Sequence, residues 1–123
     1  MILIDTGIIF DFFAGHENAE NLEILLKEAK ISLSVITIYE LFNGVENKKH
    51  ILQREEFIKL CNIIDLTTSI VRKASEIYTI LKKNGKLICN EYIIIAATAI
   101  YKKYPLYTIN KNHFKNITGL VLY

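Results

Sequence analysis

Short apolar runs alternate with helical patterns along almost the whole chain, and this alternation is the feature that most limits the fold. The first run spans residues 1–4 and ends at Asp5, and further runs of strand length occupy residues 31–35, 63–66 and 106–109. Apolar residues with helical spacing fill the segments between them. Strands that alternate with helices indicate a mostly parallel sheet covered on both faces. We therefore expect an α/β fold, a three-layer α/β/α sandwich with a short, mostly parallel sheet.

The helical segments have recognisable limits. Pro105 ends the last long helix, because proline restricts the residue before it, and Gly85 is suited to the end of the helix before that. The polar residues 110–116 predict a loop, and residues 119–123 predict a final short strand. The predicted helices cover residues 8–15, 18–30, 36–45, 50–60, 67–84 and 91–104.

The length of 123 residues suits one domain, so we expect a single domain over residues 1–123. Hydrophobic residues make up 51% and charged residues 23%, which is typical of a compact folded protein. The longest aliphatic stretch, residues 93–100, is far too short to span a bilayer, and the N-terminus lacks a signal-peptide pattern. We expect a soluble, cytoplasmic protein that does not act at a membrane.

The charge balance says little about partners. Fifteen Lys and Arg face 13 Asp and Glu, and the net charge of +2 is too small to indicate a nucleic-acid surface by itself. Basic residues do cluster, which would suit phosphate contacts if the clusters converge, but solvated helix ends explain them equally well. The clusters lie within residues 48–50, 82–86, 102–103 and 111–115.

The cysteines and histidines of the chain do not have the spacing of a metal-binding motif. Cys61 and Cys89 match no Cys/His metal motif, and His16, His50 and His113 share none, so we expect reduced, buried thiols and surface histidines. Motifs for nucleotide binding, for a nucleophilic serine and for a zinc protease are also missing. Oxygen ligands and a hard cation are the simplest remaining metal chemistry.

Two acids stand out by their positions. Asp5 follows the first strand, where an open α/β sheet presents side chains to a crevice, although it would equally serve as the N-cap of the next helix. Glu40 lies among the apolar residues of its helix, and a buried carboxylate needs a hydrogen-bonding partner or a metal. The alternative is that Glu40 points outward from an amphipathic helix.

Two further polar residues follow the fourth predicted strand, at the same edge of the sheet. They are Thr108 and Asn110. An Asn at this edge could donate to a phosphate or position a metal-bound water, but Asn is also a common turn residue.

These pieces occur in a familiar order along the chain. Residues 1–6 read MILIDT, residues 34–44 read SVITIYELFNG, residues 93–99 read IIIAATA and residues 106–114 read LYTINKNHF. Together they resemble the PIN-domain family, and in particular its VapC-type toxins. The match covers nearly the whole chain and includes the closing segment FKNITGL, at residues 114–120.

The resemblance implies a PIN-like fold and a function. It makes Asp5 the first acid and Glu40 the second, both ligands of Mg²⁺ or Mn²⁺, and it places Asn110 at the fourth position, with Thr6 and Thr108 in support. It implies a metal-dependent endoribonuclease, the toxin of a VapBC-type toxin–antitoxin pair, with RNA as substrate and a small cognate antitoxin as partner. It also implies a homodimer.

The chain departs from the family pattern at two positions. Tyr92 stands where the third acid usually lies, and Gly7 replaces the usual Asn or Ser two residues after the first acid. Glu91, at the start of a helix, could swing toward the site or act only as a first-turn acid, and Asn90 could offer a neutral oxygen. The alternative function is therefore a catalytically impaired PIN domain that binds RNA or a protein. A response-regulator-like module would need paired acids near the first strand, which the chain lacks.

Overall fold

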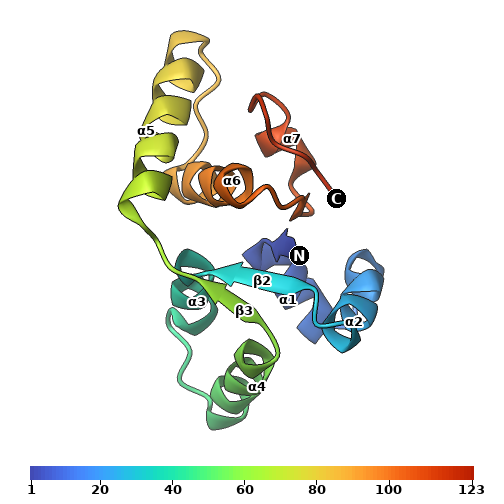
Figure 1. Cartoon of the computed structure of the whole chain (residues 1–123). Coiled ribbons are helices and arrows are strands. Elements are labelled where there is room, and N and C mark those ends of the chain that lie inside the picture. The colour runs from blue at the N-terminus through green and yellow to red at the C-terminus, as the bar shows by residue number, and fades with distance from the viewer.

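A four-stranded parallel sheet lies at the centre of the computed structural model, which describes all 123 residues (Figure 1). β1 (Ile2–Ile4) pairs with both β2 (Ile31–Ser34) and β4 (Leu106–Tyr107), and β2 also pairs with β3 (Asn62–Ile64), all in parallel. The order across the sheet is β3-β2-β1-β4. The predicted parallel α/β sandwich is thus confirmed.

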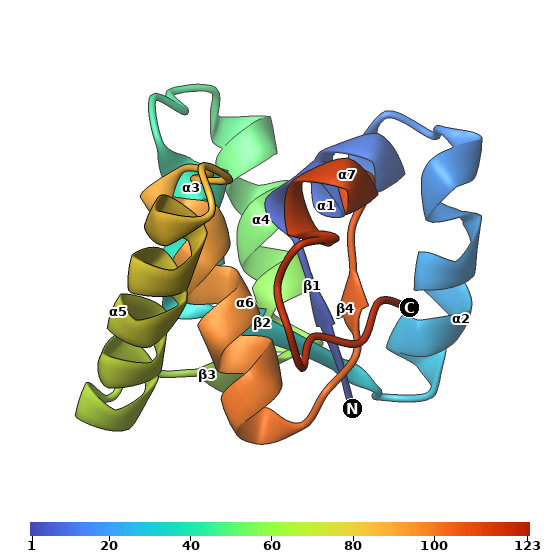
Figure 2. The same cartoon turned by 90° about the horizontal axis from the view of Figure 1, so that it is seen from above.

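Helices cover both faces of the sheet, as Figures 1 and 2 show. One layer holds α5 (Thr68–Lys83), α6 (Asn90–Lys102) and the short α7 (Lys111–Phe114). The other holds α1 (Thr6–Phe13), the 3₁₀ turn η1 (Glu17–Ala19), α2 (Glu20–Lys27), α3 (Val35–Phe42) and α4 (Lys48–Lys59).

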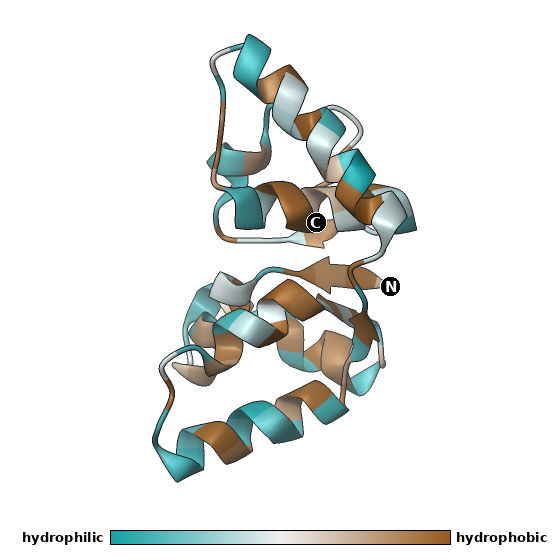
Figure 3. Ribbon diagram, turned by 90° about the vertical axis from the view of Figure 1, so that its left-hand side faces the viewer, coloured by the Kyte–Doolittle hydropathy of each residue, from teal (hydrophilic) through white to brown (hydrophobic).

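Each face of the sheet has its own apolar core. Successive side chains of a strand point to opposite faces, so Leu3 of β1 packs with the α5–α6 layer and Ile4 packs with the other layer. Figure 3 shows apolar segments of the helices on both sides of the sheet. The alanines of α6 contribute small buried side chains beside the larger ones of α5.

Three segments differ from the prediction made from the sequence. The segment expected to be a polar loop contains α7, which is anchored by the fully buried ring of Phe114. The predicted strand at residues 119–123 is wrong: it forms only one bridge, between Leu122 and Leu106, because β4 is two residues long. The helix expected at residues 18–30 is shorter and is preceded by η1.

The two thiols are free, but they are not both buried as expected. Cys61 is half-buried, whereas Cys89 is exposed because it is the N-cap residue of α6, outside the core-facing turns of that helix. None of the helices has both the length and the apolar character needed to cross a membrane.

The packing of α6 makes a direct prediction. Ala97 is fully buried, so Ala97→Leu should overfill the core and lower the free energy of unfolding by about 1 to 3 kcal/mol. Urea unfolding followed by circular dichroism measures this change. The control is Tyr101→Leu on the same helix, whose side chain is 51% exposed and whose loss should change stability by less than about 0.5 kcal/mol. Equal stability of the two variants would contradict this packing.

Candidate functional site

The candidate site lies at the carboxyl ends of β1 and β4. The chain leaves β1 for β2 on one side, and it reaches β4 on the other side of β1, so the direction of the crossovers reverses between these two strands. Such a switch point leaves a crevice at the carboxyl edge of a parallel sheet. Asp5 follows β1 at this edge, and Thr108 follows β4.

Asp5 both caps a helix and bonds to the residue that follows β4. One carboxylate oxygen, Oδ1, accepts from the Thr6 backbone N–H at 2.8 Å and so caps α1. The other, Oδ2, accepts from the Thr108 hydroxyl at 2.9 Å. The side chain is buried, with a relative exposure of 3%. The two interpretations of Asp5 that the sequence left open are therefore compatible, because capping uses one oxygen only.

Glu40 joins the same site through Thr6. The Thr6 hydroxyl donates to Glu40 Oε1 at 2.9 Å, which connects α3 to the first residue of α1. Glu40 is half-buried rather than enclosed by the apolar residues around it. It neither points simply outward nor lies deep in the core, and its second carboxylate oxygen has no hydrogen bond within the protein.

Burial raises the pKa of both carboxyl groups. For Asp5 the pKa lies above its ordinary 3.8 despite the opposing effects of the Thr108, Thr6 and Asn110 hydrogen bonds and of His113. For Glu40 the pKa lies above 4.5, and the negative charges of Asp5 and Glu91 raise it further against the Thr6 hydrogen bond. Two acids that resist ionisation in a shared crevice favour a bound cation, which would offset both costs.

Asn110 faces the crevice from the loop after β4. Its backbone N–H donates to the Thr108 hydroxyl oxygen at 3.0 Å, which holds the loop against the strand end. Its side-chain Nδ2 donates to the hydroxyl of Tyr92 at 3.1 Å, and the same side chain lowers the pKa of Asp5. The amide is therefore shared between Asp5 and Tyr92.

In the sequence, Tyr92 was notable only because it stands where the third acid usually lies. In the structure, its hydroxyl belongs to the polar network of the site. The ring packs against His113 and Phe114 with centroid distances of 5.1 Å each. Burial, followed by the charge of Asp5, raises the pKa of Tyr92 above 10.0, so the phenol stays neutral at ordinary pH. Because the oxygen accepts from Asn110, its proton remains available for donation. The position within the PIN-like pattern was the one signal that pointed here.

Glu91 and Asn90 lie at the exposed start of α6 and form no hydrogen bond or ion pair with the acids of the crevice. Glu91 is still close enough for its charge to raise the pKa of Glu40. The chain holds no group of three or more His, Cys, Asp or Glu side chains placed to bind a metal ion. A cation in this crevice would depend on the pair Asp5 and Glu40.

Gly7 has an apolar neighbour in place of a polar side chain. A Cβ atom added to Gly7 would lie 3.2 Å from Cδ1 of Ile109 and 3.3 Å from Cγ1, so Ile109 fills the space that a larger residue would need. The loop after β4 thereby lies directly against the start of α1. The hydrogen bonds expected from an Asn or Ser at this position are replaced by close packing.

Comparisons with known proteins by family, by sequence and by structure point to the same family. The family model described as the PIN domain matches residues 2–120. Ribonuclease VapC1 of Methanocaldococcus jannaschii is 38% identical over 124 residues, which cover 99% of this chain and 86% of that protein. The structure of VapBC2 from Rickettsia felis, bound to a DNA fragment from its promoter, contains a similar chain with a TM-score of 0.85 and 29% identity, covering 100% of this chain and 98% of that one. A toxin–antitoxin complex from Klebsiella pneumoniae gives a TM-score of 0.79 at 26% identity and covers 98% and 96%.

The raised pKa of Asp5 predicts how stability depends on pH without metal. Ionising Asp5 costs more in the folded than in the unfolded chain, so the protein loses stability as the pH rises through 3.8 and then through the higher folded pKa. Asp5→Asn removes this loss. In EDTA, the unfolding free energy of the variant minus that of the wild type should increase between about pH 4 and about pH 7. A difference that shrinks over this range would contradict the assignment.

Proposed function

The chain belongs to the PIN-domain family, and we propose that it is a metal-dependent endoribonuclease, the toxin of a VapBC-type toxin–antitoxin pair. The observation that carries the proposal is the Asp5–Glu40 pair, which Thr6 joins by two hydrogen bonds at the switch point of the sheet. Similarity to Ribonuclease VapC1 over 99% of the chain supports the reaction class.

The donor set at the crevice fits a hard divalent cation. Asp5 and Glu40 offer carboxylate oxygens, and Mg²⁺ typically keeps several waters while one or two carboxylates hold it. The raised pKa values of both acids supply a physical reason for binding, because a cation stabilises their ionised forms. Mg²⁺ or Mn²⁺ bound there would neutralise charge on an RNA phosphate and activate water for hydrolysis.

The side chains around the acids have separate tasks in this proposal. Thr6 and Thr108 fix the orientation of Glu40 and Asp5, respectively, through hydrogen bonds of 2.9 Å each. The Tyr92 hydroxyl offers a neutral donor at a position where an acid would repel the phosphate. The tyrosine therefore lowers the negative charge of the site while keeping it polar, which suits one cation held by two acids.

RNA as substrate agrees with the distribution of part of the basic residues. Lys111 begins α7 directly after Asn110, whose side chain belongs to the polar network of the site. Lys102 is ten residues beyond Tyr92 on α6, about 15 Å along the helix axis, and the 102–103 cluster therefore does not join the site. Of these two clusters, only the one that begins at Lys111 adjoins the polar network in the chain.

A protein partner is part of the same proposal. The Klebsiella pneumoniae relative is described as a toxin–antitoxin complex, which supports a small antitoxin as the partner of this chain. Exposed large apolar side chains offer surface both for that partner and for a second copy in a homodimer, which stays a prediction. Among them are Tyr39, Leu52, Val71 and Ile80.

Removal of either acid tests the metal mechanism. Asp5→Ala and Glu40→Ala should each abolish Mg²⁺-dependent RNA cleavage and growth inhibition, because each removes one of the two carboxylates that position the cation against the phosphate. Cleavage of labelled RNA by purified protein measures the first effect. Glu23→Ala, which removes an exposed acid of α2 paired with Lys27, is the matched control and should cleave normally. Unchanged cleavage by an Asp5→Ala preparation free of other nucleases would contradict the metal mechanism.

Tyr92 favours a second candidate function, an impaired PIN domain that binds RNA or a protein without cleaving it. In an active enzyme, Tyr92→Phe keeps the ring packing but loses the hydroxyl, which should lower cleavage by about fivefold, the value of one hydrogen bond. In an impaired protein, Tyr92→Asp should instead create cleavage that the wild type lacks. A robust wild-type rate with Mg²⁺ rejects the impaired alternative. If the wild type is inactive and Tyr92→Asp gains no cleavage, Tyr92 is rejected as the cause of the impairment.

A further inference from the structure

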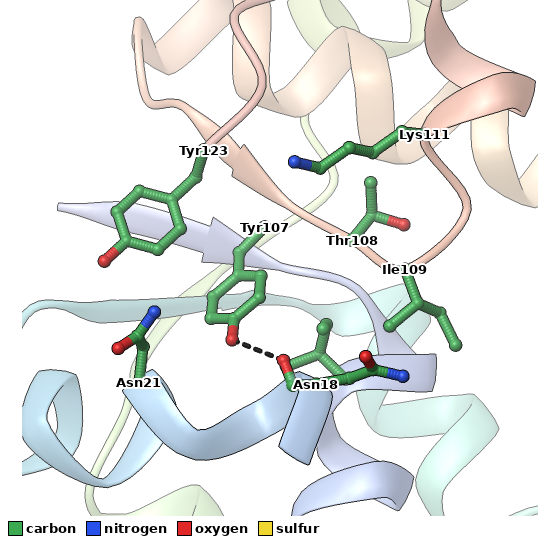
Figure 4. A pocket seen from close by; sticks show the side chains of 8 residues that line it. Asn18, Asn21, Tyr107, Thr108, Ile109, Lys111 and Tyr123 are labelled. Carbon is green, nitrogen blue, oxygen red and sulfur yellow. Dashed lines mark hydrogen bonds between the residues drawn. The ribbon is translucent and has the colours of Figure 1, made fainter. Parts of the chain in front are cut away.

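A hollow of about 560 Å³ lies on the other side of Thr108 from Asp5. Figure 4 shows its lining, which comes from α1, η1 and the start of α2, from β4 and the loop after it, from α7 and from Tyr123. Thr108 forms the shared wall, because it lines the hollow while its hydroxyl donates to Asp5 at 2.9 Å. No function described so far uses this space.

We propose that this hollow binds one unpaired nucleoside of the RNA substrate, with the base against Tyr123 and an adjoining phosphate at Lys111. The inference rests on the proposed function, since it names how the same site would hold its substrate. Single-stranded RNA exposes base faces for stacking and base edges for hydrogen bonding, so a subsite for it needs an aromatic surface, polar edge groups and a cation.

The aromatic surface is Tyr123. Its side chain is 42% exposed, and its ring lies 5.0 Å from the ring of Tyr107 at an interplanar angle of 47°. Tyr107 is fixed in turn, because its hydroxyl donates to the Asn18 carbonyl at 2.7 Å, as Figure 4 shows. Tyr123 thus has a rigid support and remains open to stacking by a base.

The polar edge group is Asn21. Its side chain lines the hollow and forms none of the side-chain hydrogen bonds of the protein, whereas Asn18 donates weakly to Asp11 at 3.3 Å. A free amide carries neighbouring donor and acceptor groups, and such a pair matches the edge of a nucleobase. Figure 4 places this amide on the same side of the hollow as the Tyr107 hydroxyl.

The cation is Lys111. It takes part in none of the ion pairs of the structure, and no Asp or Glu lines the hollow. Its ammonium group therefore has no acidic partner there and is available to a phosphate. Lys111 and Thr108 line the same hollow, and the Thr108 hydroxyl donates to Asp5, so a phosphate held by Lys111 lies on the Thr108 side of the acids.

Binding without cleavage tests this subsite independently of catalysis. The wild-type chain in EDTA is titrated into fluorescein-labelled oligo-A, oligo-C, oligo-G and oligo-U, and anisotropy gives the affinities. Tyr123→Leu should weaken binding by about tenfold through lost stacking. Lys111→Ala should reduce the slope of log affinity against log salt by about 0.7, as expected for one lost phosphate contact on a single strand. Asn21→Ala should change the ranking of the four oligomers.

Matched controls are Tyr101→Leu and Lys102→Ala, which remove an exposed tyrosine and a lysine toward the opposite end of α6 and should bind as the wild type does. Wild-type affinity of Tyr123→Leu, or an unchanged salt slope for Lys111→Ala, overturns the subsite. Displacement of the RNA by adenosine monophosphate at equal affinity also overturns it, since the hollow would then serve a free nucleotide. Loss of cleavage in Asp5→Ala alongside unchanged binding by Tyr123→Leu rejects the subsite and leaves the nuclease proposal standing.

Discussion

A chain of hydrogen bonds from Thr108 through Asp5 and Thr6 to Glu40 connects β4, β1, α1 and α3 at one edge of the sheet. Each link uses a side chain that follows a strand or begins a helix, so the site depends on where those elements end. Asp5 is the centre of this chain because its two oxygens serve different partners, a helix start and a strand end. Any loss of Asp5 therefore affects local structure as well as ligand binding.

The energetic constraint on the site is the burial of negative charge. Asp5 and Glu40 both have raised pKa values, and further acids would add repulsion without adding partners. Tyr92 avoids the repulsion that a further carboxylate would add. Its phenol remains neutral, accepts a hydrogen bond from Asn110 and packs on His113. The site is thus less acidic than the PIN-like pattern predicts, and the Tyr92 hydroxyl still belongs to its hydrogen-bond network.

Thr108 divides two environments of opposite character. On one side lie the acids, which favour a cation, and on the other lies a hollow with no acid, one unpaired lysine and an open aromatic ring. A cation site beside a surface suited to a base and a phosphate is what cleavage of a single strand requires. The two proposals therefore describe adjoining halves of one substrate path.

The sequence by itself determined the local structure: parallel strands alternating with helices, Asp5 after the first strand, and Glu40 within a mainly apolar helix. The periodicity of apolar residues and the positions of strand ends predict local structure, because both depend on residues close together in the sequence. Only the tertiary structure decided which distant groups meet, since Thr108 reaches Asp5 across 103 residues through the strand order alone. It also decided between Glu91 and Tyr92, because one residue turns a helix by about 100°, which leaves Glu91 exposed while the Tyr92 hydroxyl meets Asn110.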